Sequence, residues 1–249
     1  RHRPGDGALP SVVPRRYGVP MPRYFTPKLF AFLRDLAENN DRDWFKAHQD
    51  LFEEHVREPA LQFIEDFSEP LLGVSEHFTA DARKVGGSLF RIHRDTRFSK
   101  DKTPYKTHVG IHFRHIATRD DVHAPGFYLH LEPRGSFAAL GLWHPATENA
   151  YAIRERIAGD PAGWKRAAHG RLFEGLYGGL EGESLKRPPR GFDPAHPLLE
   201  DLKRKDFIAS TRLTQAEVTS PDFMRTYLAT VKAGGPFMRY LCEAIGVRF

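Results

Sequence analysis

The spacing of apolar residues along the chain changes from one part to the next. In the first part, apolar positions recur every three to four residues, as in Leu29, Phe30, Leu33 and Leu36, which is the period of an amphipathic helix. Pro27 and Pro59 suit the first position of a helix. We therefore predict three helices, beginning at Pro27, within residues 41–56, and at Pro59.

The middle of the chain alternates apolar and polar residues instead, which is the period of a β-strand. This alternation predicts strands in residues 88–94 and 106–116 and a hairpin over 127–145, with its turn at 133–136. Pairing Glu132 with Phe137 puts apolar residues opposite one another on one face. On the other face, this register sets His130 opposite Ala139 and Tyr128 opposite Gly141.

Residues 147–169 and most of the last fifty residues return to helical spacing, apart from an extended basic segment at 185–192. The order of helices, strands and helices predicts an α+β fold, with an antiparallel sheet packed against N-terminal and C-terminal helices. We expect one domain over residues 21–249. Residues 1–20, rich in Pro, Gly and Arg, are expected to be a disordered tail or an over-long start.

The composition narrows the possible classes of protein. The single cysteine, Cys242, excludes an internal disulfide framework and a thiolate zinc site, and it fits a reducing compartment. No apolar run approaches the roughly 18 residues that a membrane helix needs. We therefore expect a cytoplasmic protein without a membrane partner.

Positive charge is concentrated in one segment. Residues 83–114 contain nine Lys or Arg and two Asp, a net charge of +7, whereas the whole chain carries +5. Residues 1–20 contribute +3, so residues 21–82 and 115–249 together carry a net charge of −5. The protein is thus basic in one place rather than throughout.

The basic segment contains the spacing R-x-x-R-D-x-R-F-x-x-x-D-K-x-x-Y. Its fixed positions are Arg91, Arg94, Asp95, Arg97, Phe98, Asp101, Lys102 and Tyr105. This pattern resembles that of a bacterial family of unknown function, domain of unknown function 2461. The resemblance extends from about Phe25 to the C-terminus, including "NNDRDWF", "EPRGSF" and "LKRPPRGF", and it implies no activity.

Arginine and lysine side chains in this density favour an anion as ligand, because guanidinium groups bind phosphate or carboxylate oxygens in pairs. We expect a basic pocket over the sheet that binds a phosphate-bearing or other anionic small molecule, with enzymatic activity and cofactor left open. The expected ligand-binding residues are Arg91, Arg94, Arg97, Lys102, Tyr105, Lys106, His108 and Tyr128. Asp95, His130 and Glu132 are the candidate catalytic groups.

Four other interpretations remain open. The charges could form a structural ion-pair network, or the basic segment and Lys186, Arg187 and Arg190 could bind nucleic acid. His108, His112, His130 and Glu132 offer metal ligands, but 13 histidines make such spacing unremarkable. A solvated sheet face would also place polar residues there.

Overall fold

The structure is a computed structural model that describes residues 23–249 except 119, 120 and 122. The expectation for residues 1–20 therefore lies outside the described residues. Helices come first: α1 (Pro27–Glu38), α2 (Arg42–Ala47), α3 (Gln49–Phe52), the π-helical turn η1 (Glu53–Arg57) and α4 (Glu58–Leu72). Asp41 caps α2 by accepting hydrogen bonds from two backbone N–H groups of its first turn, which fixes where that helix begins.

A five-stranded antiparallel sheet occupies the middle of the chain, in the order β1-β2-β3-β4-β5. Its strands are β1 (Phe78–Thr79), β2 (Val109–His115), β3 (Gly126–Leu131), β4 (Phe137–Leu142) and β5 (Phe207–Arg212), and the short helix η2 (Ile116–Thr118) follows β2. The expected α+β fold is confirmed. The sequence predicts no strand at β5: its helical pattern ends at Phe207 and resumes at Thr214, although buried Phe207 and Ala209 alternate with more exposed residues.

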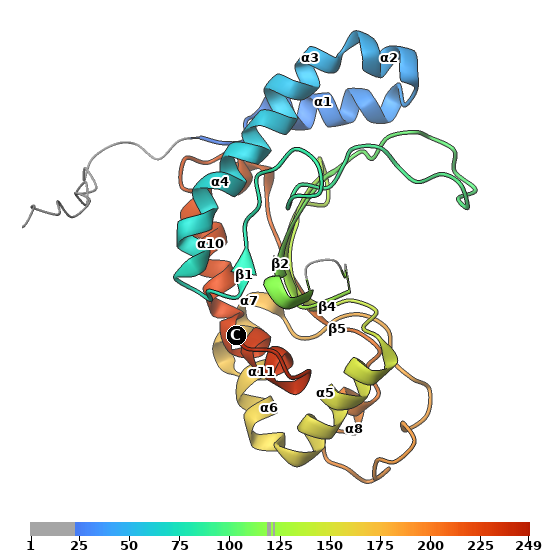
Figure 1. Cartoon of the computed structure of the whole chain (residues 1–249), viewed down its shortest axis with the longest axis vertical. Coiled ribbons are helices and arrows are strands. Elements are labelled where there is room, and N and C mark those ends of the chain that lie inside the picture. Colours follow the sequence, from blue (N-terminus) through green and yellow to red (C-terminus); the bar gives the residue numbers. More distant parts are fainter. Residues whose placement is uncertain (1–22, 119–120, 122) are drawn as a thin grey trace, which may run out of the picture.

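The remaining helices lie on both sides of β5 in the sequence. They are α5 (Thr147–Gly159), α6 (Pro161–Ala168), α7 (Arg171–Tyr177), α8 (Leu199–Leu202), α9 (Gln215–Val218), α10 (Phe223–Ala233) and α11 (Gly235–Ala244). Helices α4, α7, α10 and α11 contact the strands and lie along one side of the sheet (Figure 1). The other face of the sheet is turned away from these helices.

The two faces of the sheet differ as the alternation predicted. One face is the core: Ile111, Phe113, Phe127 and Leu129 are fully buried. The register of the hairpin, however, was wrong by two residues, because His130 lies opposite Phe137 and Tyr128 opposite Ala139. The turn closes on Ser136, whose hydroxyl bonds both the N–H and the carbonyl oxygen of Glu132. A shift of two residues keeps every side chain on its expected face.

The basic segment extends beyond the sheet as an arm, which we define as residues 93–105. His93 and Tyr105 pair at its base, and residues 88–90 continue the pairing against β2. Residues 88–94 thus pair as expected but only through isolated bridges rather than a full strand. In Figure 1 the arm runs in teal and green below α1 and α2.

Candidate functional site

Two stretches that resemble the family meet where the arm touches α2. The Asn40 side chain donates to the carbonyl oxygen of Tyr105 and accepts from its N–H, each at 3.0 Å. The ring of Tyr105 stacks on Phe45 with centroids 4.1 Å apart. Tyr105 is buried. The turn before α2 therefore holds the base of the arm in a fixed position.

A cavity of about 480 Å³ lies between the helices and the arm, and we call it the arm cavity. Arg42, Lys46 and Arg57 line it from the helices, and His93 and Arg94 line it from the arm. The other lining residues are Phe45, Gln49, Thr96, Pro104 and Tyr105, so the lining contains no carboxylate.

The cations of the arm cavity differ in how they are paired. Arg57 forms an ion pair with Glu53 at 2.6 Å, and Arg94 pairs with Asp101 and also donates to Thr103. Arg42 and Lys46 have no hydrogen-bond or ion-pair partner within the described part of the chain. The pKa of His93 is lowered, first by burial and then by nearby guanidinium groups, Arg57 and Arg42 among them.

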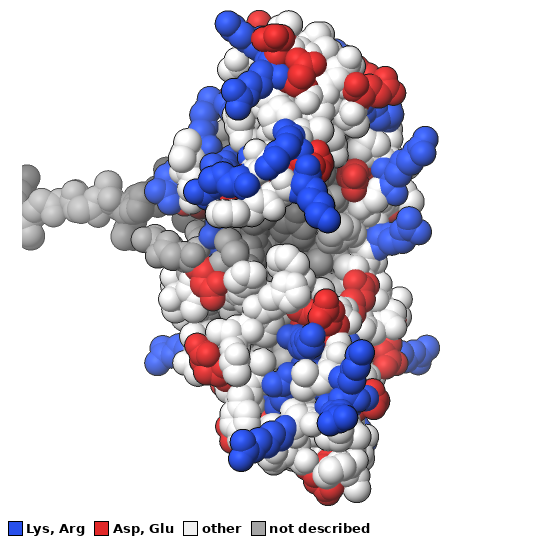
Figure 2. All heavy atoms as spheres, turned by 90° about the vertical axis from the view of Figure 1, so that its right-hand side faces the viewer, with Lys and Arg blue, Asp and Glu red and all other residues white. Residues whose placement is uncertain are grey.

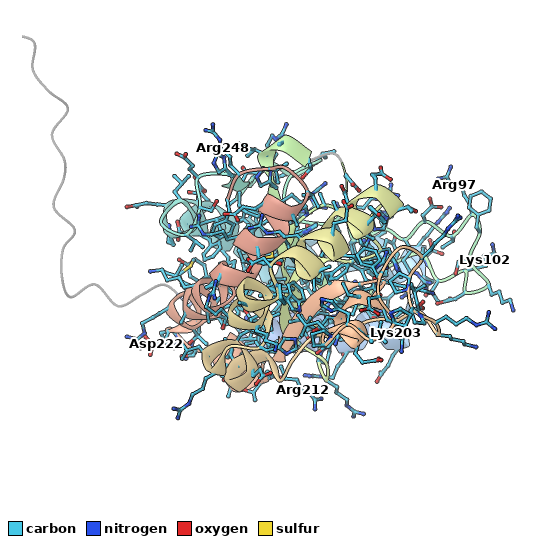
Figure 3. The ribbon with its side chains drawn as sticks, turned by 90° about the horizontal axis from the view of Figure 1, so that it is seen from below. Arg97, Lys102, Lys203, Arg212, Asp222 and Arg248 are labelled. Atoms are coloured by element: carbon cyan, nitrogen blue, oxygen red, sulfur yellow. The ribbon has the colours of Figure 1, made fainter. Side chains whose placement is uncertain are left out.

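Both carboxylates of the arm pair with arginines of the arm, whereas Lys100 and Lys102 have no carboxylate partner among the described residues. Arg97 pairs with Asp95 at 2.7 Å, and the Lys102 ammonium donates to the carbonyl oxygen of Thr96. Arg97 and Lys102 lie at the outer edge of the molecule (Figure 3). The hydrogen bonds from Arg97 lower the pKa of Asp95 to about 2, so this carboxylate is a weak base.

A second cavity, of about 490 Å³, opens on the sheet face that points away from the helices, and we call it the sheet-face cavity. Its wall consists of His112, Gly126, Tyr128, His130, Phe137, Ala139, Leu140, Gly141 and Ile208 from the strands, with Phe90, Ala124 and Trp143 around them. None of these residues carries a fixed charge. The two cavities share no lining residue.

The polar residues of this face form a chain of hydrogen bonds. The Tyr128 hydroxyl lies 3.1 Å from His130 Nδ1, and His130 Nε2 lies 3.2 Å from Glu132 Oε2. The His130 ring is stacked between His108 and Phe137, with centroids 4.4 and 4.6 Å away. Burial lowers the pKa of His108 to about 4 and that of His112 to about 3.

The structure thus divides the residues that the sequence grouped into one site. Arg94 and Tyr105 line the arm cavity, whereas Tyr128 and His130 line the sheet-face cavity. Lys106 lies with its ammonium 5.3 Å from the centroid of Phe90, a residue of the sheet-face cavity. Arg91 is exposed and lines neither cavity.

Sequence reasoning missed the helical half of the arm cavity: Arg42, Lys46 and Arg57. Its only signal was the "NNDRDWF" stretch, which the family resemblance included but which was not connected with the arm. Metal binding gains no support, because no group of three or more His, Cys, Asp or Glu in the described part of the chain could hold an ion. The described helices include none long and apolar enough to cross a membrane.

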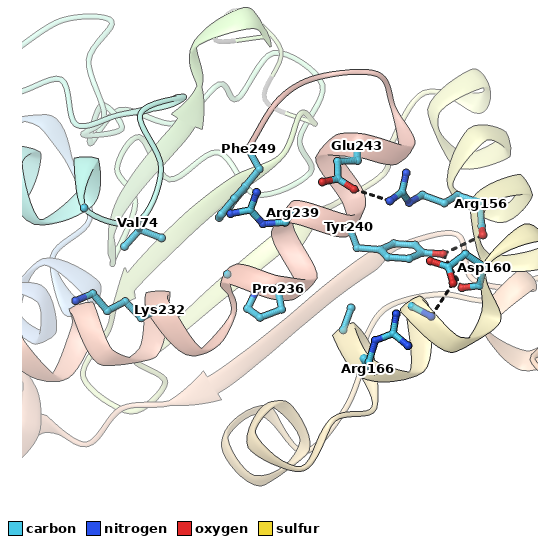
Figure 4. A pocket seen from close by; sticks show the side chains of 14 residues that line it. Val74, Arg156, Asp160, Arg166, Lys232, Pro236, Arg239, Tyr240, Glu243 and Phe249 are labelled. Carbon is cyan, nitrogen blue, oxygen red and sulfur yellow. Dashed lines mark hydrogen bonds and ion pairs between the residues drawn. The ribbon is translucent and has the colours of Figure 1, made fainter.

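A third cavity, of about 510 Å³, lies beside α11 and includes the C-terminal Phe249 (Figure 4). Several of its polar groups already have partners within the protein. Arg156 pairs with Glu243, and the Tyr240 hydroxyl contacts the carbonyl oxygens of Arg156 and Asp160. Because Asp160 and Glu243 also line it, this cavity differs in charge from the arm cavity.

Comparison with known proteins identifies the family. The model of the family described as Conserved hypothetical protein (DUF2461) matches residues 28–240. The chain belongs to the DUF2461 family. The DUF2461 match includes α2, the arm and all five strands, so both the arm cavity and the sheet-face cavity lie inside it. No curated protein and no solved structure matches the chain significantly.

Proposed function

We propose that this DUF2461 protein binds an anionic small molecule, such as one that carries a phosphate group, in the arm cavity. The observation that carries the proposal is the charge of the lining, in which four Lys or Arg side chains face one cavity without a carboxylate among them. Guanidinium and ammonium groups form their strongest hydrogen bonds with anionic oxygens.

The unpaired cations make an anion the most favourable occupant. Arg57 and Arg94 already have carboxylate partners, whereas Arg42 and Lys46 have none among the described residues. Bringing cations close together raises their electrostatic energy, and a bound anion relieves that repulsion. Lys and Arg side chains are also prominent on the face of the molecule that carries the arm (Figure 2).

Nucleic acid remains the alternative ligand. Its binding depends on neutralising many phosphates along an extended surface, so its affinity falls steeply with salt. Half of the cations of the arm are instead paired with carboxylates within it, Arg97 with Asp95 and Arg94 with Asp101. This local pairing favours a small anion in the arm cavity over a polyanion along the arm.

Isothermal titration of the full chain with inorganic phosphate, pyrophosphate, mononucleotides and oligonucleotides tests the proposal. We expect the double variant Arg42→Ala/Lys46→Ala to weaken binding of the best small anion at least tenfold, because each charge-assisted hydrogen bond contributes about 1.5 to 3 kcal/mol. Arg94→Ala should weaken it as well.

Two control variants locate the anion. Arg166→Ala/Lys232→Ala removes two cations from the cavity beside α11, and Arg97→Ala removes one from the arm tip. Both should bind like the wild type. An equal loss in either control would place the anion elsewhere, and tight, strongly salt-dependent binding of oligonucleotides alone would favour nucleic acid.

A further inference from the structure

The sheet-face cavity requires a different kind of ligand from the arm cavity. Aromatic rings and small residues make up most of its wall, and no residue of the wall has a fixed charge. Flat apolar walls of this kind bury planar rings well, because aromatic groups stack with offset or edge-to-face geometry. The polar side-chain atoms in the wall belong to Tyr128, His130, His112 and Trp143, and the backbone supplies the rest.

The strands leave room for these side chains by using glycine. A Cβ atom on Gly110 would lie 2.7 Å from the Tyr128 hydroxyl, and one on Gly126 would lie 2.0 Å from His112 Nε2. Any larger residue at these two positions would displace the polar groups. The sheet is therefore built to hold Tyr128 and His112 close to its surface.

The hydrogen-bond chain has a defined direction. The carboxylate of Glu132 can only accept a hydrogen bond, so His130 Nε2 carries the proton between them. His130 Nδ1 is then without a proton and accepts from the Tyr128 hydroxyl. The Tyr128 oxygen keeps an acceptor position for a donor on a ligand. Side-chain exposure rises from 12% at His130 to 42% at Glu132, so the chain leads from the cavity toward solvent.

Packing keeps His130 neutral and oriented. Burial lowers its pKa, while the hydrogen bond and charge of Glu132 oppose that change. His108 and Phe137 hold the ring from both sides. Lys106 and Arg94 also lie near this pair, and they add to burial, the larger effect, in lowering the pKa of His108. A neutral imidazole beside a carboxylate is a suitable proton acceptor, because the carboxylate stabilises the cation that forms.

His112 provides a second, independent indication of a ligand. Its side chain is buried, with 8% of its surface exposed, and it lines the same cavity. Its ring nitrogens have no hydrogen-bond partner among the residues that the structure describes. They are not among the fully enclosed unpartnered atoms of the structure, so they reach the cavity surface, where a polar group in the cavity can bond them.

We propose that the sheet-face cavity binds a planar aromatic or heteroaromatic molecule with an acidic O–H or N–H group, and that His130 accepts this proton through the Tyr128 hydroxyl. The ligand proton passes to the Tyr128 oxygen as the Tyr128 proton passes to His130 Nδ1. The ligand becomes an anion and His130 an imidazolium beside Glu132. Only these O–H or N–H bonds change, so the step needs no oxidant or other reactant.

para-Nitrophenol is a direct probe, because its phenol and phenolate forms absorb light at different wavelengths. We expect saturable binding to the full-length protein, with a larger phenolate fraction in the bound probe than in the free probe at the same pH. Tyr128→Phe and His130→Gln should retain binding within a few-fold but lose the phenolate excess. Ala139→Leu should abolish binding by filling the cavity.

Two further variants keep the result interpretable. Glu132→Gln keeps a hydrogen-bond partner for His130 but removes the charge, so it should reduce the phenolate excess even if the His130 variant does not fold. Arg166→Ala/Lys232→Ala, which removes two cations from the cavity beside α11, should leave the probe unaffected, so the phenolate excess would not come from that basic surface. No saturable binding by the wild type, or an equal phenolate fraction in the wild type and all three polar variants, would overturn the proposal.

Discussion

Leucine substitutions at two neighbouring positions of β4 distinguish an open face of the sheet from a packed one. Ala139 lines the sheet-face cavity of about 490 Å³. Ala138, the adjacent residue, is 2% exposed and lies opposite Leu129 on the core face. Each substitution adds three carbons. At Ala139 these carbons enter open space, whereas at Ala138 they must displace packed side chains.

The expected free energies differ in size. Burying a methylene group contributes about 0.8 kcal/mol, so burying half the surface of three carbons contributes about 1 kcal/mol. Restricting the rotamers of leucine costs about 0.5 to 1 kcal/mol. The free energy of unfolding of Ala139→Leu should therefore stay within about 0.5 kcal/mol of the wild type. Overpacking a core usually costs about 1 to 3 kcal/mol, which is the loss expected for Ala138→Leu.

Urea denaturation measures both values, provided that the dependence of the free energy on urea concentration is the same in each variant. Titration with para-nitrophenol should show no binding to Ala139→Leu, while anion binding in the arm cavity stays unchanged. If Ala139→Leu is destabilised as much as Ala138→Leu, the face that carries Tyr128 is packed, and the reasoning about an open cavity fails.

Other predictions concern the base of the arm and the buried histidines. Asn40→Ala removes both hydrogen bonds to Tyr105, so it should lower the free energy of unfolding by about 1 to 3 kcal/mol and weaken phosphate binding. Asn39→Ala loses one exposed hydrogen bond and should cost less than about 1 kcal/mol. Equal losses in the two variants would show that Asn40 does not specifically hold the base of the arm. The pKa values of His108 and His112, about 4 and 3 in the folded chain against an ordinary 6.5, mean that the unfolded chain binds more protons below pH 6.5. Stability measured by urea denaturation should therefore fall as the pH decreases from 6.5 toward 4, and His112→Gln should reduce this slope; an unchanged slope would show that His112 does not contribute.

The secondary structure and the sheet faces could be predicted because they follow from local periodicity. Alternation placed Tyr128 and His130 on the face opposite the core, and it stayed correct when the register moved by two residues. The register itself depended on the Ser136 hydroxyl, which closes the turn through hydrogen bonds that alternation does not reveal. The strand β5 is short and lies between two segments of helical spacing, so its alternation was too brief to be recognised.

Only the side of the arm cavity that the arm contributes could be predicted from the sequence. The spacing of charges indicated Arg94, but Arg42 and Lys46 come from a helix about fifty residues earlier in the chain. Which turn of that helix faces the arm depends on tertiary contacts, namely the hydrogen bonds between Asn40 and Tyr105 and the stacking of Phe45 on Tyr105. Charge density along the sequence also overstated the arm tip, because Arg97 and Asp95 neutralise each other at a separation of two residues.

The arm is an extension of the same pairing that includes β2, and this continuity has a thermodynamic consequence. Residues 93 and 105 pair at the base of the arm, residues 88–90 pair with β2, and Phe90 and His112 on these segments line the sheet-face cavity. If anion binding displaced the arm, the positions of Phe90 and His112 in the wall of the sheet-face cavity would change as well. Whatever factor an anion applies to the affinity for the ring ligand, the ring ligand must apply to the affinity for the anion, since linkage between two binding equilibria is reciprocal.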